Sequence, residues 1–315
     1  MHPACCKGYT SGVSALNRKL SRIKRNIPLY IMLIIPMVYI LLFKYVPMLG
    51  TVVAFKKYNI FKGILESDWV GFKHFKEAFA AREFRLAIRN TLILNIGGLL
   101  INFPFPIVTA ILLSEMRYKK VKKITETILY IPHFLSMVVI AGIMYQVFGP
   151  RGIVNGLFGR AGANAIPFMT NEISWRIIYW GSGVWSGLGY GMIIYLAAIA
   201  GINTELYDAA YIDGAGRWKR IWHVTLPQMR PTIVTMTVMN VGKILSIGFE
   251  RPYLLSNVAV KNASSVISTY VYSVGLQAGR YDFAAAVGVF QSVVCVCMVL
   301  IANKVARKLG EEGIM

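Results

Sequence analysis

The chain is short of the residues that soluble enzymes and metal or redox sites require. Only 15% of its 315 residues are charged, with 14 acids against 34 Lys and Arg, whereas 56% are apolar. So little charge excludes an ordinary soluble domain of this length. The four cysteines and four histidines have no metal-ligand spacing, and no Gly-x-x-x-x-Gly-Lys-Ser/Thr phosphate loop is present. We therefore predict a membrane protein that binds no metal or cofactor itself and hydrolyses no ATP.

The cysteines indicate no disulfide framework. Cys5 and Cys6 lie in the N-terminal tail, and Cys295 and Cys297 fall on different faces of the last apolar run. A reduced cytoplasmic tail and apolar packing account for all four, although the role of Cys5 and Cys6 stays open.

The sequence is rich in long apolar runs. An α-helix needs about 17 to 25 such residues to cross the hydrocarbon core. We predict six spans: 28–49, 91–113, 128–148, 177–200, 233–249 and 283–302. Lys44 near the end of the first span can reach the interface, whereas Lys243 lies in the middle of the fifth. The expected fold class is all-α, a polytopic membrane protein with six transmembrane helices.

Basic residues indicate the orientation, because cytoplasmic segments near span ends carry the excess of Lys and Arg. They cluster before the first span and on alternate connections: Lys7, Arg18, Lys19, Arg22, Lys24, Arg25, Arg117, Lys119, Lys120, Lys122, Lys123, Arg217, Lys219, Arg220, Arg230, Lys304, Arg307 and Lys308. We expect a cytoplasmic tail at 1–27, a transmembrane domain at 28–302 and a second cytoplasmic tail at 303–315. The outer loop 50–89 is also basic, but charge in a longer loop weighs less.

The net charge of +20 is spread over segments that flank the membrane. Anionic headgroups attract such segments, so this charge favours a lipid surface and not nucleic acid. The first apolar run is too long for a signal-peptide core and has no small-x-small cleavage site. We interpret it as a retained anchor.

A polar segment with three glycines, 201–228, separates the fourth and fifth spans. Asn203 or Thr204 can cap a short helix, and Glu205 near its start suits the helix dipole. Gly214 then allows a sharp exit. These signals predict a small transverse helix below the membrane.

That helix has the features of a docking element. The small side chains of Ala209 and Ala210 make the helix narrow on that side, so a partner groove can close around it. Asp208 offers a carboxylate to the partner. The predicted coupling residues are Glu205, Asp208, Ala209, Ala210, Asp213, Gly214 and Arg217. Further along, Trp218, Ile221 and Trp222 are expected to pack against span ends, and Pro227 to stop the segment before the next span.

Polar residues in the fifth span indicate a transport route. Asn240, Lys243, Ser246 or Ile247, and Glu250 have the spacing of one helix face. Polar groups in a span are costly and usually face a bundle interior or a wet cavity. An alternative is that Lys243 pairs with Glu250 or reaches the interface for structural reasons.

The fourth span combines small residues with amphipathic aromatics. Gly183, Gly187 and Gly191 form a ridge that lets another helix approach closely. Aromatic rings beside hydroxyls suit sugar rings, so we predict that this span also lines the route, through Trp180, Ser182, Trp185, Ser186 and Tyr190. Interfacial placement and lipid-facing packing are the alternative for each.

Two outer segments have a readable pattern. The aromatics of 72–79 recur at helical spacing between charges, which predicts a short helix at the outer interface. The last outer loop, 251–282, could fold back toward the pore mouth or form a plain solvent loop.

The full spacing from Asp208-Ala209-Ala210 through Gly214 to Leu226-Pro227, on a cytoplasmic loop, resembles the signature loop of ABC importer permeases. Outside that loop the chain resembles maltose-type carbohydrate permeases, in particular their LplB-like branch, over about 27–309. The matching stretches are Trp69-Val-Gly71-Phe-Lys-His-Phe75, Tyr130-Ile-Pro132-His-Phe, Tyr270-Val-Tyr-Ser-Val-Gly275-Leu-Gln-Ala-Gly279 and Ile301-Ala-Asn-Lys304. Asp208 stands where the signature usually has Glu, a shorter carboxylate of the same charge.

The resemblance implies a type I importer subunit with a cytoplasmic coupling helix, in the cell membrane. It implies a second, usually different, permease, two ATPase subunits that hold ATP and Mg, and an extracellular or periplasmic solute-binding protein that delivers an oligosaccharide. It also implies that substrate contacts come from the spans on either side of the signature loop, and that alternating access follows closure of the ATPases.

Other functions remain open from the sequence. An ABC permease for another small solute fits the loop equally well. A secondary transporter would carry coupling acids and repeated halves, yet only Glu250 approaches membrane depth. A channel would leave the loop unexplained. The basic outer loops and Lys243 favour an oligosaccharide that contains uronate, such as a fragment of pectin or alginate, but the exact saccharide and its length are not determined.

Overall fold

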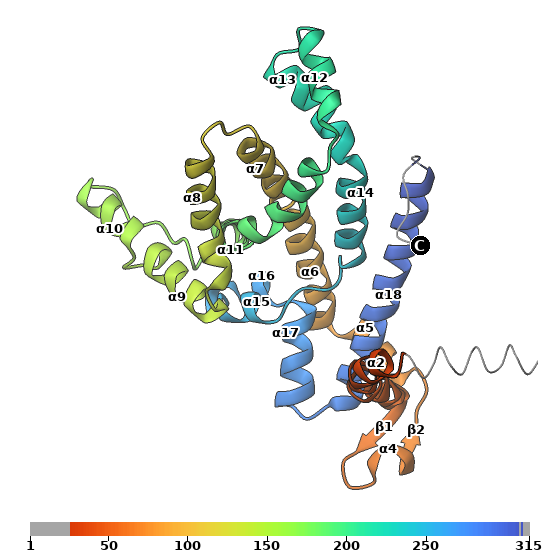
Figure 1. The fold of residues 1–315 in the computed structure, drawn as a ribbon. Coiled ribbons are helices and arrows are strands. Elements are labelled where there is room, and N and C mark those ends of the chain that lie inside the picture. The colour runs from red at the N-terminus through yellow and green to blue at the C-terminus, as the bar shows by residue number, and fades with distance from the viewer. Residues whose placement is uncertain (1–25, 309, 311–315) are drawn as a thin grey trace, which may run out of the picture.

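The computed structural model describes residues 26–308 and 310 and is almost entirely helical (Figure 1). Within this part of the chain, five helices are long and apolar enough to cross a membrane: Ile27–Phe55, Arg82–Ser114, Met137–Arg160, Glu172–Ala200 and Tyr281–Lys308. The all-α membrane fold is thus confirmed. Most of the predicted basic tail, with Cys5 and Cys6, lies outside the described residues. The last helix runs past the predicted boundary at residue 302.

The first span is a single interrupted helix that packs against the rest of the chain only at its end, where its last element lies against α18 (Tyr281–Lys308). It comprises α2 (Ile27–Ile40), the π-helical η1 (Leu41–Tyr45), α3 (Val46–Met48) and the 3₁₀ helix η2 (Leu49–Phe55). None of its first three elements has a buried residue, and only Val53 and Ala54 of η2 are buried. Such apolar exposure requires lipid or another membrane subunit to cover it.

The outer loop after this span contains a small β-hairpin that the all-α prediction did not include. Strands β1 (Lys56–Asn59) and β2 (Ser67–Trp69) are antiparallel, and α4 (Gly63–Glu66) lies between them. The amphipathic helix predicted for 72–79 is confirmed as α5 (Lys73–Ala80), and its position at the outer interface stays a prediction. In Figure 1 the hairpin and the helices α12 and α13 lie at opposite ends of the molecule.

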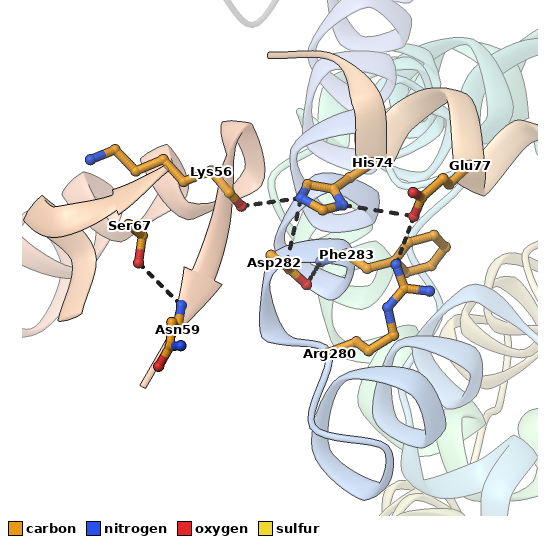
Figure 2. Close-up of polar contacts among 8 residues, drawn as sticks. All are labelled: Lys56, Asn59, Ser67, His74, Glu77, Arg280, Asp282 and Phe283. Carbon is orange, nitrogen blue, oxygen red and sulfur yellow. Dashed lines mark hydrogen bonds and ion pairs between the residues drawn. The ribbon is translucent and has the colours of Figure 1, made fainter. Parts of the chain in front are cut away.

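A polar cluster joins this outer segment to the start of α18 (Figure 2). His74 is 4% exposed, and its Nε2 lies 3.1 Å from the Lys56 carbonyl oxygen and 3.5 Å from a carboxylate oxygen of Asp282. Beside it, Arg280 donates a 2.7 Å hydrogen bond to Glu77, which lowers the pKa of that carboxyl group. The cluster therefore holds the hairpin, α5 and α18 together.

The predicted third span, 128–148, is wrong as a single helix. The second span comprises α6 (Arg82–Ile101) and α7 (Pro104–Ser114). The region of the predicted third span is divided among shorter elements: α8 (Lys119–Tyr130), η3 (Ile131–Phe134), α9 (Met137–Phe148) and α10 (Ile153–Arg160). The backbone is extended at Leu135 and Ser136, and the Ser136 hydroxyl accepts a 3.3 Å hydrogen bond from the Val139 N–H. A hydroxyl cap starts a new helix there, so the apolar run is divided.

The fourth span is one uninterrupted helix, α11 (Glu172–Ala200). Side chains from other elements approach the backbone closely at two of the three predicted ridge glycines, Gly183 and Gly191. The third, Gly187, has open space, since no atom lies within 4 Å of a Cβ added there. The closest backbone approach is at Gly189, which the ridge pattern missed. A Cβ there would contact the Leu129 carbonyl oxygen and lie 2.7 Å from the Tyr130 Cα.

Gly189→Ala is therefore expected to destabilise the protein by about 1 to 3 kcal/mol, the usual range for overpacking. The added methyl group meets backbone atoms, so α8 must move away from α11. Thermal denaturation of the purified complex in detergent is the measurement. Gly187→Ala is the matched control, on the same helix with open space around it, and should change stability by less than about 0.5 kcal/mol. Equal stability of the two variants would contradict the close packing.

The predicted fifth span, 233–249, is also wrong at its end. The chain after α11 forms α12 (Thr204–Ile212), α13 (Arg217–Arg220), the π-helical η4 (Ile221–Thr225) and α14 (Leu226–Gly242). No helix continues through 243–249. Pro227 does not stop the preceding segment, because the wider π-turn of η4 precedes the ring and lets the helix run on into α14.

The last outer loop is a folded part of the core, so the solvent-loop alternative is wrong. Its elements are α15 (Glu250–Leu254), η5 (Val258–Val260), α16 (Lys261–Ser264), α17 (Ile267–Val271) and η6 (Tyr272–Gln277), followed by α18 (Tyr281–Lys308). Side chains of the spans bind its backbone. The Trp175 indole donates to the Leu255 carbonyl at 2.7 Å, and the Asn90 amide to the Asn262 carbonyl at 2.6 Å.

Candidate functional site

The segment after α14 is non-helical, and other helices satisfy its backbone. The Asn95 amide, from α6, donates to the Ile244 carbonyl at 2.7 Å. Gln291, from α18, donates to the Leu245 carbonyl at 2.9 Å. Irregular backbone at membrane depth is tolerated only where protein buries it or where it lines a cavity. The broken end of α14 is therefore compatible with membrane depth, because α6 and α18 bind its carbonyl groups.

Two cavities open beside this break. One, of about 440 Å³, lies between α6, α7, α11 and α14, and the other, of about 660 Å³, extends to the start of α15. Asn95, Gly98, Asn102 and Ser246 line both, so the two spaces adjoin. We call the first the inner cavity and the second the outer cavity, because the outer one adjoins the folded last outer loop.

The polar residues predicted from the fifth span gather around these cavities. Asn240, Lys243 and Ser246 line the inner cavity, and Glu250 lines the outer one. The premise that they share one helix face is wrong, because α14 ends at Gly242. The unwound segment nevertheless brings them to adjoining spaces. In the described part of the chain no ion pair joins Lys243 to Glu250.

The predicted residues of the fourth span divide between two sides of α11. Tyr190 lines the inner cavity. Ser186 is buried and contacts a residue of the outer cavity, Arg251, whose guanidinium donates to its hydroxyl at 3.2 Å. The other three lie outside both cavities: Trp180 donates to the Leu94 carbonyl, Ser182 is buried against the backbone of its own helix, and Trp185 lines a separate apolar pocket.

Three cavity residues were missed by the sequence reasoning. Asn95 and Asn102 are amides within a predicted apolar span, and that polarity was an available signal. Arg251 directly follows Glu250 and was assigned to the outer loop. Only the fold of that loop carries it back against α11.

The predicted short helix is confirmed as α12, and its transverse position below the membrane stays a prediction. Asn203 is its cap, accepting a 3.0 Å hydrogen bond from the Glu205 N–H, and Gly214 leaves it with a φ of +72°. Six of the seven predicted coupling residues are exposed and Ala210 is half-buried. The Tyr207 hydroxyl lies 3.0 Å from the Thr225 hydroxyl, which fixes α12 against η4.

The aromatic residues after α12 do not all pack as predicted. Ile221 is buried among residues of α7, α11 and α14. Trp218 and Trp222, however, are 71% and 65% exposed. The two indoles are four residues apart and lie beside the stripe that buries Ile221 and Thr225, so both indoles stay outside the packed side of the helix. An exposed apolar surface beside α12 is typical of an interaction site.

Comparison with known proteins identifies the family. Residues 106–310 match the family described as binding-protein-dependent transport system inner membrane component. The chain belongs to this family of ABC importer permeases. It is similar to the polygalacturonan/rhamnogalacturonan transport system permease protein YteP of Bacillus subtilis (strain 168), at 43% identity over 91% of this chain and 89% of YteP. It is also 38% identical to Protein LplB of the same organism, over 94% of this chain and 93% of LplB.

A solved structure agrees with this assignment. The permease is similar to a chain in the crystal structure of a bacterial alginate ABC transporter in complex with an alginate pentasaccharide-bound periplasmic protein. The TM-score is 0.85 and the identity 40%, over 93% of this chain and 99% of that chain. The expected resemblance to carbohydrate importer permeases is confirmed, and the family assignment decides against a secondary transporter or channel.

Proposed function

We propose that the permease forms half of the translocation pathway for oligosaccharides that contain uronate, such as fragments of pectin or alginate. The observation that carries this proposal is the lining of the two cavities, where Lys243 and Arg251 provide positive charge and Asn95, Asn102 and Asn240 provide amides. Amides suit sugar hydroxyls, and cations suit carboxylates. The named substrates of YteP and of the alginate transporter support the same chemistry.

In this proposal the permease works together with other subunits of one transporter. A second, different permease covers the open side of the cavities and part of the exposed first span. Two ATPase subunits hold ATP and Mg and dock on α12, where Asp208 is exposed, and on the neighbouring exposed indoles of Trp218 in α13 and Trp222 in η4. A binding protein delivers the oligosaccharide from outside, and both termini of the permease lie in the cytoplasm of the cell that it serves.

The helix that follows α12 supports a mechanical link between docking and transport. The chain is continuously helical from Arg217 to Gly242, through α13, η4 and α14, which is roughly 40 Å at about 1.5 Å per residue. Tyr207 fixes α12 to the base of this helix, and Asn240 lies near its far end in the inner cavity. Movement of α12 can thus shift this long helix as a rigid body and change the shape of the inner cavity.

The test is uptake by the complete transporter reconstituted in proteoliposomes with its binding protein. A galacturonate trimer should enter at least about 10-fold faster than the same trimer with its carboxyl groups reduced to alcohols, because charge-assisted hydrogen bonds are about twice as strong as neutral ones. The trimer should also require ATP. Equal entry of the acidic and the neutral trimer would refute the proposed specificity.

A further inference from the structure

Arg251 occupies an unusual position for a charged side chain. It lies in the first turn of α15, directly after the unwound segment, and lines the outer cavity. Its guanidinium carbon lies 5.7 Å from the centre of the Tyr179 ring, and one terminal nitrogen donates to the Ser186 hydroxyl at 3.2 Å. Both partners belong to α11, so the arginine is held in one orientation against that helix.

The charge of Arg251 has no counter-charge among the residues that the structure describes. Across residues 26–308, no carboxylate lies within ion-pair distance of it, and its neighbour Glu250 forms no ion pair with it. Its Nε is a buried donor without a hydrogen-bond partner. A cation beside a membrane-embedded cavity is costly unless a counter-charge, water or a ligand meets it. The arrangement therefore leaves a positive charge and a free donor available to an anionic ligand in the outer cavity.

Asn102 and Arg251 converge on one point above α11. A Cβ added to Gly183 would lie 2.6 Å from the Asn102 Nδ2 and 2.7 Å from an Arg251 terminal nitrogen. Only a glycine leaves room for both groups at this position. The two nitrogens come from α15 and from the end of α6, and both are hydrogen-bond donors. A planar guanidinium beside an amide N–H₂ is a donor set suited to a carboxylate.

We propose that Arg251 and Asn102 form a carboxylate-binding subsite over Gly183, distinct from Lys243 in the inner cavity. The subsite selects uronate residues as the oligosaccharide passes from the outer to the inner cavity. This inference rests on the proposed function, since it assumes that an acidic oligosaccharide uses these cavities. It adds a specificity-determining residue that the sequence pattern did not identify.

Arg251→Gln tests the subsite in the complete reconstituted transporter, with uptake of a galacturonate trimer and of its carboxyl-reduced, neutral form. We expect uptake of the acidic trimer at low concentration to fall about 10-fold or more, and uptake of the neutral trimer to change less than about 2-fold. Arg251→Lys keeps the charge but lacks the planar guanidinium. Its uptake of the acidic trimer should therefore lie between that of Arg251→Gln and that of the parent.

Arg176→Gln is the matched control. Arg176 lies on α11, also has a buried Nε without a partner, and lines neither cavity. Its removal should leave the preference for the acidic trimer unchanged. If Arg251→Gln fails to assemble, Gly183→Ala places a methyl group between the two donors and should produce the same selective loss.

The outcomes separate this inference from the proposed function. Equal uptake of the two trimers by the parent transporter would contradict both the proposed function and the subsite. A parent preference that persists in Arg251→Gln would overturn the subsite alone. An equal loss for the acidic and the neutral trimer would also overturn it, because Arg251 would then only hold α15 against α11.

Discussion

Replacing Asp208 with lysine is expected to abolish substrate-stimulated ATP hydrolysis while the permease still inserts and folds. Asp208 is exposed near the middle of α12, a helix capped by Asn203 and fixed to η4 by Tyr207, so its carboxylate is presented to a partner in a defined position. In the proposed assembly α12 docks on a basic ATPase surface, so charge reversal would set like charges together at a cost of several kcal/mol. We expect stimulation by the loaded binding protein to fall at least about 10-fold.

Asp208→Glu is the control for this prediction. It keeps the charge, lengthens the side chain by one methylene group and restores the residue that the signature usually contains, so stimulation should remain close to that of the parent. The measurement is ATPase activity of the reconstituted complex with and without loaded binding protein. Undiminished stimulation in Asp208→Lys would show that α12 does not dock through this carboxylate.

Lys243→Met is expected to reduce transport with assembly and basal ATP hydrolysis intact. Lys243 is exposed at the broken end of α14 and lines the inner cavity, where it has no carboxylate partner among the described residues. If its ammonium group meets a uronate, its loss removes a charge-assisted hydrogen bond of about 1.5 to 3 kcal/mol, which is roughly a 10- to 150-fold effect. Uptake of the acidic trimer should therefore fall more than uptake of the neutral one.

Lys243→Arg retains the charge and should retain most of the acidic uptake, which separates charge from side-chain length. Transport is measured in proteoliposomes after the heteromeric complex has been purified. Parent-like uptake in Lys243→Met would place the residue outside the route. A loss of equal size for both trimers would keep it in the route but remove the case for recognition of a carboxylate.

Local signals predicted the parts of the fold that depend on neighbouring residues. The apolar runs of the fourth and sixth spans correspond to α11 and α18, because burial in lipid requires a long helix with internally paired backbone groups. The cap at Asn203 and the exit at Gly214 are equally local, since a side-chain oxygen and a left-handed glycine act within one turn.

The helix breaks could not be predicted in this way. The run after Gly242 is apolar enough to read as helix, but Asn95 and Gln291 satisfy its carbonyl groups from distant helices. Those bonds compensate for the helical hydrogen bonds that the segment loses. The partners lie far away in sequence, so no local pattern reveals them.

The sequence by itself determined the class of the protein, the capped helix α12 and the presence of a lysine at membrane depth, because hydrophobicity, capping and intramembrane charge are properties of single segments. Only the tertiary structure decided which polar residues face a common space. It placed Trp180 and Trp185 outside the cavities and carried Arg251 from an apparent outer loop to a point above Gly183. The reason is physical: a cavity is formed by side chains from several helices, and their convergence depends on contacts between residues far apart in the chain.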